Sequence, residues 1–398
     1  MTAPIFIDLT HTSHTRARTG VQRVARALLQ DLGSAVQPIC HDPFLRAWRP
    51  LEGWEMANLA AAAPTAGRAA RWPFRARIRG LLRRLLRARR RGPVFPGHGS
   101  LLVPEIFSPA VAAALPGLFG AVDGPRAALF HDAVALTHPE LAPPRTVARA
   151  PAYLQELADF DGIAAVSEAS RDKLIGYWRW LGLHDPPPIA AIPLGIDPPA
   201  RPAPQPERTL PVVLSVGSIE GRKNHLALIE ACERLWSRGM RFELRLIGLA
   251  RPQTGDPALR RIGELQRAGR PLVHLGAAND AAREDAYAAC AFTVYPSLAE
   301  GFGLPVAESL ARGRPCVCLG RGGPGEIARG GGCLTVDPAD ADTLSTAIGR
   351  LLSAPGELAG LAAAAGARPI RTWSAYGRDL AAWLHGLQRR RSGPPRGP

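Results

Sequence analysis

From residue 211 onward, short apolar runs alternate with longer stretches in which apolar residues recur every three to four positions. The runs are Val212–Val216, Phe242–Ile247, Leu272–Leu275, Phe292–Tyr295 and Pro315–Leu319. Runs of this length are typical of strands buried on both faces, and the helical period between them predicts amphipathic helices. Strands that alternate with helices predict a parallel sheet covered on both sides.

The first half of the chain repeats this pattern less regularly. Strands are predicted at Ile5–Leu9, Ala127–Phe130 and Ile163–Val166, and a helix at Val21–Leu32. Between the halves, the segment Asp197–Glu207 contains five prolines, which predicts a stiff, unpaired linker. We therefore expect two α/β domains, at residues 1–200 and 201–373.

The C-terminal residues form a third part of the pattern. An amphipathic stretch from Ser374 to Leu387 follows a complete second sheet, so we expect a helix at 374–388 that packs back on the first domain. Residues 389–398 are polar and basic, which predicts a disordered tail.

Length and composition agree with a two-domain intracellular protein. The chain has 398 residues, of which 46% are hydrophobic. Its six cysteines are scattered; Cys316 and Cys318 share one face of a predicted strand, and no further ligands follow at metal-binding spacing. We therefore expect reduced thiols and no metal. The N-terminus has no basic segment followed by an apolar one, and no apolar run approaches the ~20 residues that span a bilayer, so we expect a cytoplasmic protein.

The net charge of +15 is concentrated in two segments. Eleven arginines and no acidic residue lie between Arg68 and Arg91, and four more arginines lie in the last twelve residues. Local excess of this kind indicates contacts with particular anions, not a uniformly basic coat for nucleic acid.

Within the basic segment 68–91, the stretch from Ala76 to Arg91 predicts an amphipathic helix. Its apolar residues recur at i, i+3, i+4, i+7 and i+8, and they are Ile78, Leu81, Leu82, Leu85 and Leu86. One interpretation is a surface helix whose leucines dock on the domain core. The other is a helix lying in the plane of an anionic membrane surface. No aromatic residue is interleaved with these arginines, so we expect no nucleic-acid partner.

The strongest chemical signal runs from Tyr295 to Glu308. A predicted strand ends at Tyr295, a loop containing Gly301 and Gly303 follows, and a helix is expected from about Leu304 with Pro305 in its first turn. Glycines allow close approach of a ligand to the backbone, and free N–H groups at a helix start suit a phosphate. Carboxylates would repel a phosphate, so Glu300 and Glu308 are better suited to accept hydrogen bonds from sugar hydroxyls. The alternative is a strand–turn–helix with two solvated glutamates.

Three weaker signals accompany this loop. Arg222 and Lys223 stand just before a helix predicted from Asn224, where cations and the helix dipole favour an anion. His131 follows a predicted strand, and Gly20 follows the first strand in the stretch Thr19–Arg23. Taken alone, a histidine at a strand end is more often structural than catalytic, and a single glycine is a poor phosphate loop.

These motifs closely resemble those of glycosyltransferase family 4. The family hallmark is a pair of glutamates separated by seven residues around Gly-Phe-Gly-Leu-Pro, as in Glu300 to Glu308. The resemblance implies a GT-B fold, in which two Rossmann-like domains face each other across a cleft. It implies that Glu308 holds the nucleotide ribose and Glu300 the transferred sugar. The backbone around the diphosphate and sugar would be that of Gly301, Phe302, Gly303 and Leu304.

The resemblance extends to the weaker signals. It implies that Arg222 and Lys223 bind the donor diphosphate, that His131 lies near the reacting sugar, and that Gly20 touches the donor from the first domain. Two departures occur: Gly221 stands where the family usually has proline, and Ser218 where some members have another arginine. The first loosens the loop, and the second removes one cation.

The expected function is therefore retaining transfer of a sugar from a nucleotide-diphosphate sugar, with no metal and no other cofactor. The expected acceptor is a lipid-linked glycan in polysaccharide or lipopolysaccharide synthesis. That acceptor and the basic helix together predict a peripheral protein on the inner face of the cytoplasmic membrane. Two alternatives remain: a GT-B sugar epimerase, or an inactive nucleotide-sugar-binding partner in a glycan assembly complex.

Overall fold

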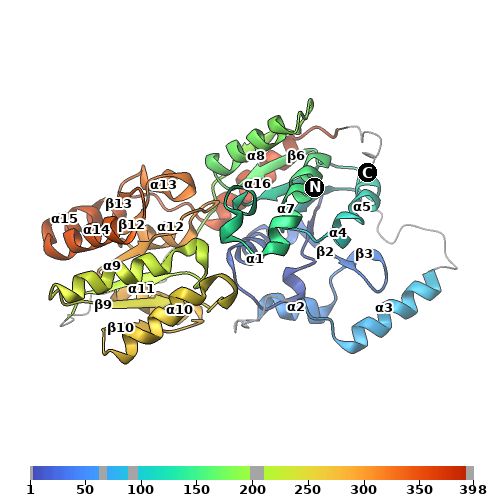
Figure 1. Cartoon of the computed structure of the whole chain (residues 1–398). Helices are drawn as coiled ribbons and strands as arrows, with labels where there is room; N and C mark the ends of the chain where they lie inside the picture. The colour runs from blue at the N-terminus through green and yellow to red at the C-terminus, as the bar shows by residue number, and fades with distance from the viewer. Residues whose placement is uncertain (1–2, 62–69, 88–96, 198–209, 391–398) are drawn as a thin grey trace.

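The structure is a computed structural model, and it describes residues 3–61, 70–87, 97–197 and 210–390. Two separate sheets build it (Figure 1). The predicted linker falls largely on residues 198–209, and part of the predicted tail on 391–398; both lie outside the described residues.

The first sheet has seven strands in the order β3-β2-β1-β4-β5-β6-β7. All neighbours are parallel except the antiparallel pair β2 and β3. The strands are β1 (Ile5–Asp8), β2 (Val36–Asp42), β3 (Ala47–Pro50), β4 (Ser100–Val103), β5 (Arg126–Phe130), β6 (Gly162–Ala165) and β7 (Ile189–Ala191).

Helices of the first domain connect these strands and cover the sheet (Figure 1). They are α1 (Gly20–Leu32), α2 (Gly53–Ala60), α3 (Phe74–Arg87), α4 (Pro109–Ala112), α5 (Leu115–Ala121), α6 (Val134–Thr137), α7 (Pro144–Glu156) and α8 (Glu168–Trp180). A short 3-10 turn, η1 (Thr12–His14), follows β1 and leads into the loop before α1. The predicted helix at 21–32 and the predicted strands of this half are confirmed to within one residue at either end.

The second sheet has six parallel strands in the order β10-β9-β8-β11-β12-β13. They are β8 (Val212–Val216), β9 (Glu243–Ile247), β10 (Leu272–His274), β11 (Phe292–Tyr295), β12 (Cys316–Leu319) and β13 (Cys333–Val336). Its helices are α9 (His225–Ser237), α10 (Pro252–Arg267), α11 (Asp280–Ala289), α12 (Leu304–Ala311), α13 (Gly322–Ala328), α14 (Ala341–Ser353) and α15 (Pro355–Gly366). The five strands predicted here are confirmed, and together with the first sheet they give the predicted GT-B architecture.

The last helix, α16 (Trp373–Gly386), returns to the first domain, as the sequence predicts. In Figure 1 it lies among the elements of the first domain, beside β6 and α8. Its buried side chains Tyr376, Leu380 and Leu384 join the core beneath β1 and α1. Burial of each is worth roughly 1.5–3 kcal/mol, which fixes the end of the chain to the domain where it began.

Arg389 and Arg390, the first two residues of the predicted tail, contact the first domain. Arg389 donates to the carbonyl oxygens of Asp123 and Phe119, each at 3.1 Å, and the backbone N–H of Arg390 donates to Asp161 at 2.8 Å. These two residues, assigned to the disordered tail from their composition, are therefore bound to the first domain.

Helix α3 confirms the predicted helix as far as Arg87; residues 88–91 lie outside the described part. It projects from the body of the first domain (Figure 1). The interpretation in which its leucines dock on the core is wrong, because the side that docks carries Ala76 and Gly80. A Cβ on Gly80 would lie 2.8 Å from Cβ of Phe44, so only glycine permits that approach. No helix among the described residues combines the length and apolar character needed to cross a membrane.

Candidate active site

The acidic loop joins β11 to α12, and its geometry explains its glycines. Gly303 precedes α12 with φ +105°, a left-handed conformation that favours glycine, and Pro305 lies in the first turn of the helix. Glu300 lies in the loop, and Glu308 lies within α12 with only 2% of its surface exposed. The helix start and its glycine therefore lie where the sequence predicts them.

Glu300 is the centre of a buried charge cluster. Its Oε1 atom lies 2.8 Å from Nη1 of Arg222, and Lys223 Nζ and Ser297 Oγ donate to the same oxygen. Lys223 Nζ also donates to the Tyr295 hydroxyl. Burial by itself would raise the pKa of Glu300, but Arg222 and Lys223 outweigh it and lower the pKa to about 2. Glu300 is thus ionised at neutral pH.

Of the two cations in this cluster, Arg222 is shared between two carboxylates, Glu300 and Glu220. Arg222 Nε lies 3.0 Å from Oε1 of Glu220, which precedes the 3-10 turn η5 (Gly221–Lys223). Gly221, the departure from the family proline, packs closely there, since a Cβ would lie 3.1 Å from the Thr254 carbonyl oxygen. The structure therefore brings the predicted basic pair and Glu300 together, in mutual contact.

Glu308 forms a second charge cluster, and its partner comes from the first domain. Arg23, in the first turn of α1, donates through Nη2 to Oε1 of Glu308, while the Tyr287 hydroxyl lies 3.2 Å from Oε2. Burial would raise the pKa of Glu308, yet Arg23, Arg283 and Arg312 together hold it below its ordinary value. Sequence reasoning missed Arg23, although its place three residues after Gly20 at a helix start was a usable signal.

The two domains meet at the glycines of the loop. A Cβ on Gly301 would lie 1.8 Å from the carbonyl oxygen of His131, and Ser167 Oγ donates to the Gly301 carbonyl oxygen at 2.5 Å. Gly20 is close to Leu304, whose Cδ1 would lie 4.0 Å from a Cβ on that glycine. The predicted residues of the first domain and of the acidic loop therefore form one contact zone between the domains.

The His131 ring is fixed in a defined state. Its Nε2 lies 2.8 Å from the carbonyl oxygen of Pro104, an acceptor, so Nε2 carries the proton. Burial lowers the pKa of His131 below its ordinary value, which keeps the ring neutral at physiological pH. Nδ1 is then the unprotonated nitrogen. Its predicted place near the reacting sugar stays a prediction.

The side chains of Phe302 and Leu304 pack with apolar residues of the first domain. Leu304 is buried in the same core cluster as β1, α1 and α16, with Phe302 packed against it. Phe302 also lines a cavity of about 320 Å³, with Leu194 and Ile370. The residues around that cavity include neither Glu300 nor Glu308, so we do not assign the donor to it.

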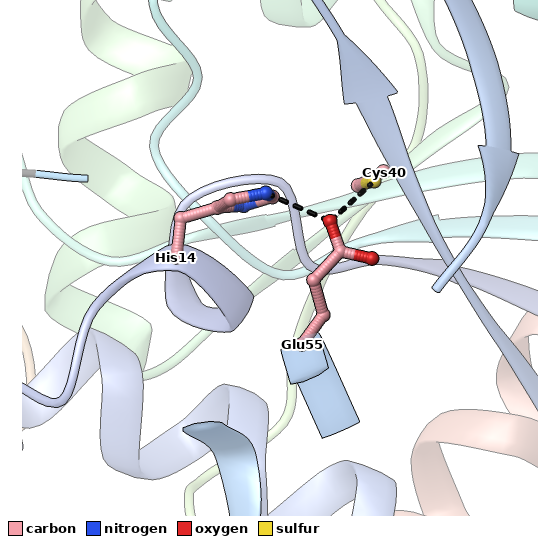
Figure 2. Close-up of side chains that lie close together, drawn as sticks. All are labelled: His14, Cys40 and Glu55. Carbon is pink, nitrogen blue, oxygen red and sulfur yellow. Dashed lines mark hydrogen bonds and ion pairs between the residues drawn. The ribbon is translucent and has the colours of Figure 1, made fainter. Parts of the chain in front are cut away.

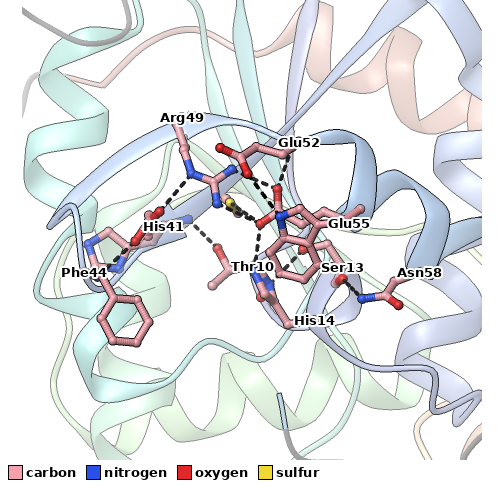
Figure 3. Close-up of polar contacts among 12 residues, drawn as sticks. Thr10, Ser13, His14, His41, Phe44, Arg49, Glu52, Glu55 and Asn58 are labelled. Atoms are coloured by element: carbon pink, nitrogen blue, oxygen red, sulfur yellow. Dashed lines mark hydrogen bonds and ion pairs between the residues drawn. The ribbon is translucent and has the colours of Figure 1, made fainter. Parts of the chain in front are cut away.

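A further buried polar cluster lies in the first domain, centred on Glu55 of α2. Figure 2 shows His14 of η1 and Cys40 of β2 converging on it, with Nε2 of His14 2.8 Å and Sγ of Cys40 3.6 Å from Oε1. Arg49 donates to both oxygens of Glu55 at 2.8 Å, and its Nε donates to Asp42 at 2.9 Å. Figure 3 shows this network continuing around the loop after β1.

This cluster resembles a metal site only in its residue types. His14, Cys40 and Glu55 are the one group in the described chain whose three ligand atoms lie within 4.8 Å of one another. The Arg49 guanidinium already neutralises the carboxylate, and a metal ion beside it would meet a buried positive charge. Burial, with Glu55 nearby, also raises the pKa of the Cys40 thiol, which opposes the thiolate that metals bind. We infer that the cluster stabilises the loop that leads from β1 to Gly20.

Comparisons with known proteins agree with this geometry. Residues 210–354 match the family model described as glycosyl transferases group 1. The chain is 31% identical to O-antigen chain mannosyltransferase B of Escherichia coli over 232 residues, or 55% of this chain and 59% of that protein. It is 24% identical to the serotype-specific mannosyltransferase WbdA of Escherichia coli, over 79% of this chain and 38% of that protein.

Solved structures show the same fold at low sequence identity. Sucrose-phosphate synthase from Thermosynechococcus elongatus aligns with a TM-score of 0.66 at 19% identity, covering 96% of this chain and 98% of that one. Anabaena HepE, in complex with UDP and glucose, aligns with a TM-score of 0.68 at 16% identity, covering 97% and 100%. These structures confirm the GT-B fold, and the family match over residues 210–354 supports the resemblance to the glycosyltransferases of group 1. The matched segments span 59% and 38% of the lengths of the two curated relatives.

Proposed function

We propose that this chain, whose C-terminal domain is that of a group 1 glycosyltransferase, transfers a sugar with retention from a nucleotide-diphosphate sugar to a glycan-type acceptor. The observation that supports this most is the pair of ionised, buried carboxylates on either side of the glycine loop. Glu300 is held by Arg222 and Lys223, and Glu308 by Arg23. Carboxylates fixed in this way accept hydrogen bonds from sugar and ribose hydroxyls without the cost of organising them on binding.

In this proposal each residue has a distinct part. Glu308 holds the ribose, Glu300 orients the transferred sugar, and the backbone of the loop from Gly301 to Leu304 follows the diphosphate. Arg222, Lys223 and the start of α12 stabilise the charge that develops on the leaving nucleoside diphosphate. Because these groups supply the positive charge, we propose that transfer needs no metal ion. Neutral His131 and Gly20 would cover the sugar from the first domain and exclude water.

Among the described residues of this site we assign none as a covalent nucleophile. We therefore propose attack on the same face of the sugar from which the diphosphate leaves, assisted by the donor phosphate. The two curated relatives are named as mannosyltransferases, and one solved neighbour contains UDP and glucose. Mannose and glucose donors are accordingly the first candidates.

The test is to incubate the protein with a panel of nucleotide sugars that includes GDP-mannose and UDP-glucose, and to measure release of nucleoside diphosphate. Release from at least one donor supports the proposal. Conversion of the sugar without release of the diphosphate would indicate the epimerase alternative. Binding of nucleotide without any turnover, with or without acceptor extracts, would indicate the inactive-partner alternative.

For the acceptor, α3 favours a substrate in a membrane. Its outward face exposes Leu82, Leu85 and Leu86 at 55%, 69% and 66%, which a soluble surface helix would ordinarily bury. Its inward side is anchored: Arg79 and Arg83 donate to the two oxygens of Glu52 at 2.8 and 2.9 Å. These ion pairs and the buried Ala76 and Gly80 orient the helix with its leucines outward, flanked by arginines.

We propose that this face enters an anionic bilayer surface and presents the first domain to a lipid-linked acceptor in polysaccharide or lipopolysaccharide synthesis. The protein would then be peripheral on the inner face of the cytoplasmic membrane. Apolar insertion and arginine attraction to anionic headgroups would act together, at ~1 kcal/mol per basic residue near the surface.

Vesicle sedimentation tests this part separately. Phosphatidylcholine vesicles with roughly one third phosphatidylglycerol should bind the protein, neutral vesicles much less, and salt should release it. A variant in which Leu82, Arg84, Leu85 and Leu86 are all replaced by glutamine should no longer bind these vesicles, while its donor hydrolysis continues. Arg83 is left intact because it anchors the helix, and Arg260→Gln, an exposed arginine of the second domain, is the charge control. If the wild type ignores anionic vesicles at low salt, a soluble acceptor replaces the lipid-linked one.

A further inference from the structure

Arg23 lies at the interdomain contact, and so far it has been described only as the ion-pair partner of Glu308. It extends from the first turn of α1 in the first domain to Glu308 in α12 of the second, 285 residues later. Its side chain is 19% exposed and that of Glu308 3%, so the ion pair is largely removed from water. An ion pair of this kind exists only while the two domains are together.

Both oxygens of Glu308 are engaged by this arrangement. Oε1 accepts from Arg23, and Oε2 from the Tyr287 hydroxyl. Two other arginines face Glu308 from the second domain, but each is paired elsewhere: Nη1 of Arg283 lies 3.1 Å from Asp280, and Nε of Arg312 lies 2.8 Å from Glu284. Arg23 is therefore the arginine that fixes the carboxylate by direct contact.

We propose that Arg23 is a positioning residue for the nucleoside end of the donor: it holds the Glu308 carboxylate in its ribose-binding orientation from across the domain interface. This inference rests on the proposed function, in which Glu308 receives the ribose. Each carboxylate oxygen has two acceptor positions, so Oε1 retains one for a ribose hydroxyl while Arg23 occupies the other. Closing the domains and preparing the nucleoside site thereby become a single event.

A double-mutant cycle tests the proposal with nucleoside diphosphates as probes. The dissociation constants of GDP and UDP are measured by titration calorimetry for the wild type, Arg23→Gln, Glu308→Gln and the double variant. We expect Arg23→Gln to weaken binding by at least ~10-fold in the wild-type background and less than about twofold when residue 308 is glutamine. Arg23→Lys, which keeps the charge, should recover part of the loss.

The pH profile supplies a readout that a purely structural role would not move. Without Arg23, the pKa of Glu308 should rise, because burial then has less positive charge against it. The ratio of variant to wild-type dissociation constants should therefore increase from pH 7.5 to pH 5.5, and titration of the ligand's own phosphate cancels in that ratio. Tyr287, Arg283 and Arg312 stay in place in both proteins.

Arg18→Gln is the matched control. Arg18 also pairs across the domains, with Nη1 3.0 Å from Asp280, but it does not contact Glu308. If it weakens binding as much as Arg23→Gln does, or if the loss from Arg23→Gln is equal in both Glu308 backgrounds, the proposal is overturned. A wild type that binds no nucleoside diphosphate overturns the proposed function itself, whereas normal binding by a folded Arg23→Gln protein overturns the inference alone.

Discussion

Gly301→Ala is the substitution whose effect follows most directly from the geometry. A Cβ at residue 301 would lie 1.8 Å from the His131 carbonyl oxygen, and real Cβ contacts stay above 3.0 Å. The two backbones must therefore separate by at least 1.2 Å, which is 3.0 minus 1.8. No side-chain rotation can relieve this clash, because the backbone sets the position of both atoms.

The displacement should act on catalysis more than on folding. It removes the hydrogen bond from Ser167 to the Gly301 carbonyl oxygen, worth ~1 kcal/mol, and shifts Glu300 relative to His131. A misplacement of about 1 Å in an active site costs on the order of 100-fold in rate. We expect the rate of nucleoside diphosphate release to fall by about that factor. The Tm should fall by only a few degrees, since each domain keeps its own core.

Gly360→Ala is the matched control. Gly360 lies on the exposed face of α15, and no heavy atom lies within 4 Å of an added Cβ, so activity should be unchanged and stability raised slightly. Initial rates and thermal unfolding of both variants form the assay. Wild-type rates in a folded Gly301→Ala protein would show that the close contact between residue 301 and the His131 carbonyl oxygen is not needed for activity.

Three further predictions follow from the charges. Lys223→Ala and Glu308→Gln should each reduce turnover by at least ~100-fold while the protein stays folded; near-normal rates in either would remove that residue from the site. Activity should persist in excess EDTA, and a strict dependence on added magnesium or manganese would contradict the leaving-group argument. Burial and Glu105 raise the pKa of Asp8 to about 7 from 3.8, so this group stabilises the fold fully below about pH 4 and less as pH rises through 7. The Tm of Asp8→Asn should accordingly fall less than that of the wild type between pH 5 and pH 8, and parallel curves would exclude the shift.

The second domain could be predicted from the sequence more completely than the first. Its strands are short apolar runs, and β8 and β11 match the predicted ranges to the residue. In the first domain four of the seven strands, β2, β3, β4 and β7, were not predicted. The pattern of β2 (Val36–Asp42) is interrupted by Gln37, Pro38 and His41, and the other three strands are only three or four residues long. The edge strand β13 was not predicted either. It has four residues, of which only Val336 is buried.

The face by which α3 docks also could not be predicted. The leucine stripe dominates the hydrophobic pattern, but the contact is made by Ala76 and Gly80, whose small size allows close approach. Small residues contribute little to a hydrophobic period, so the sequence indicated the helix and its charge but not its orientation.

For the site, local motifs predicted the position of each residue but not the partners. Glu300, Arg222 and Lys223 were each predicted as ligand-binding groups, and they pair with one another in this structure. The pairing of Arg23 with Glu308 joins residues 285 positions apart and depends on the arrangement of two domains. No local pattern in one sequence contains that information.

The most direct test of retaining transfer at this site is proton NMR of donor hydrolysis in the absence of acceptor. The first anomer released from the nucleotide sugar is observed before it mutarotates. We predict that this sugar has the same anomeric configuration as the donor, and that Glu308→Gln releases it at least ~100-fold more slowly. Initial release of the opposite anomer would contradict retention, and release that does not depend on Glu308 would contradict the assignment of the site.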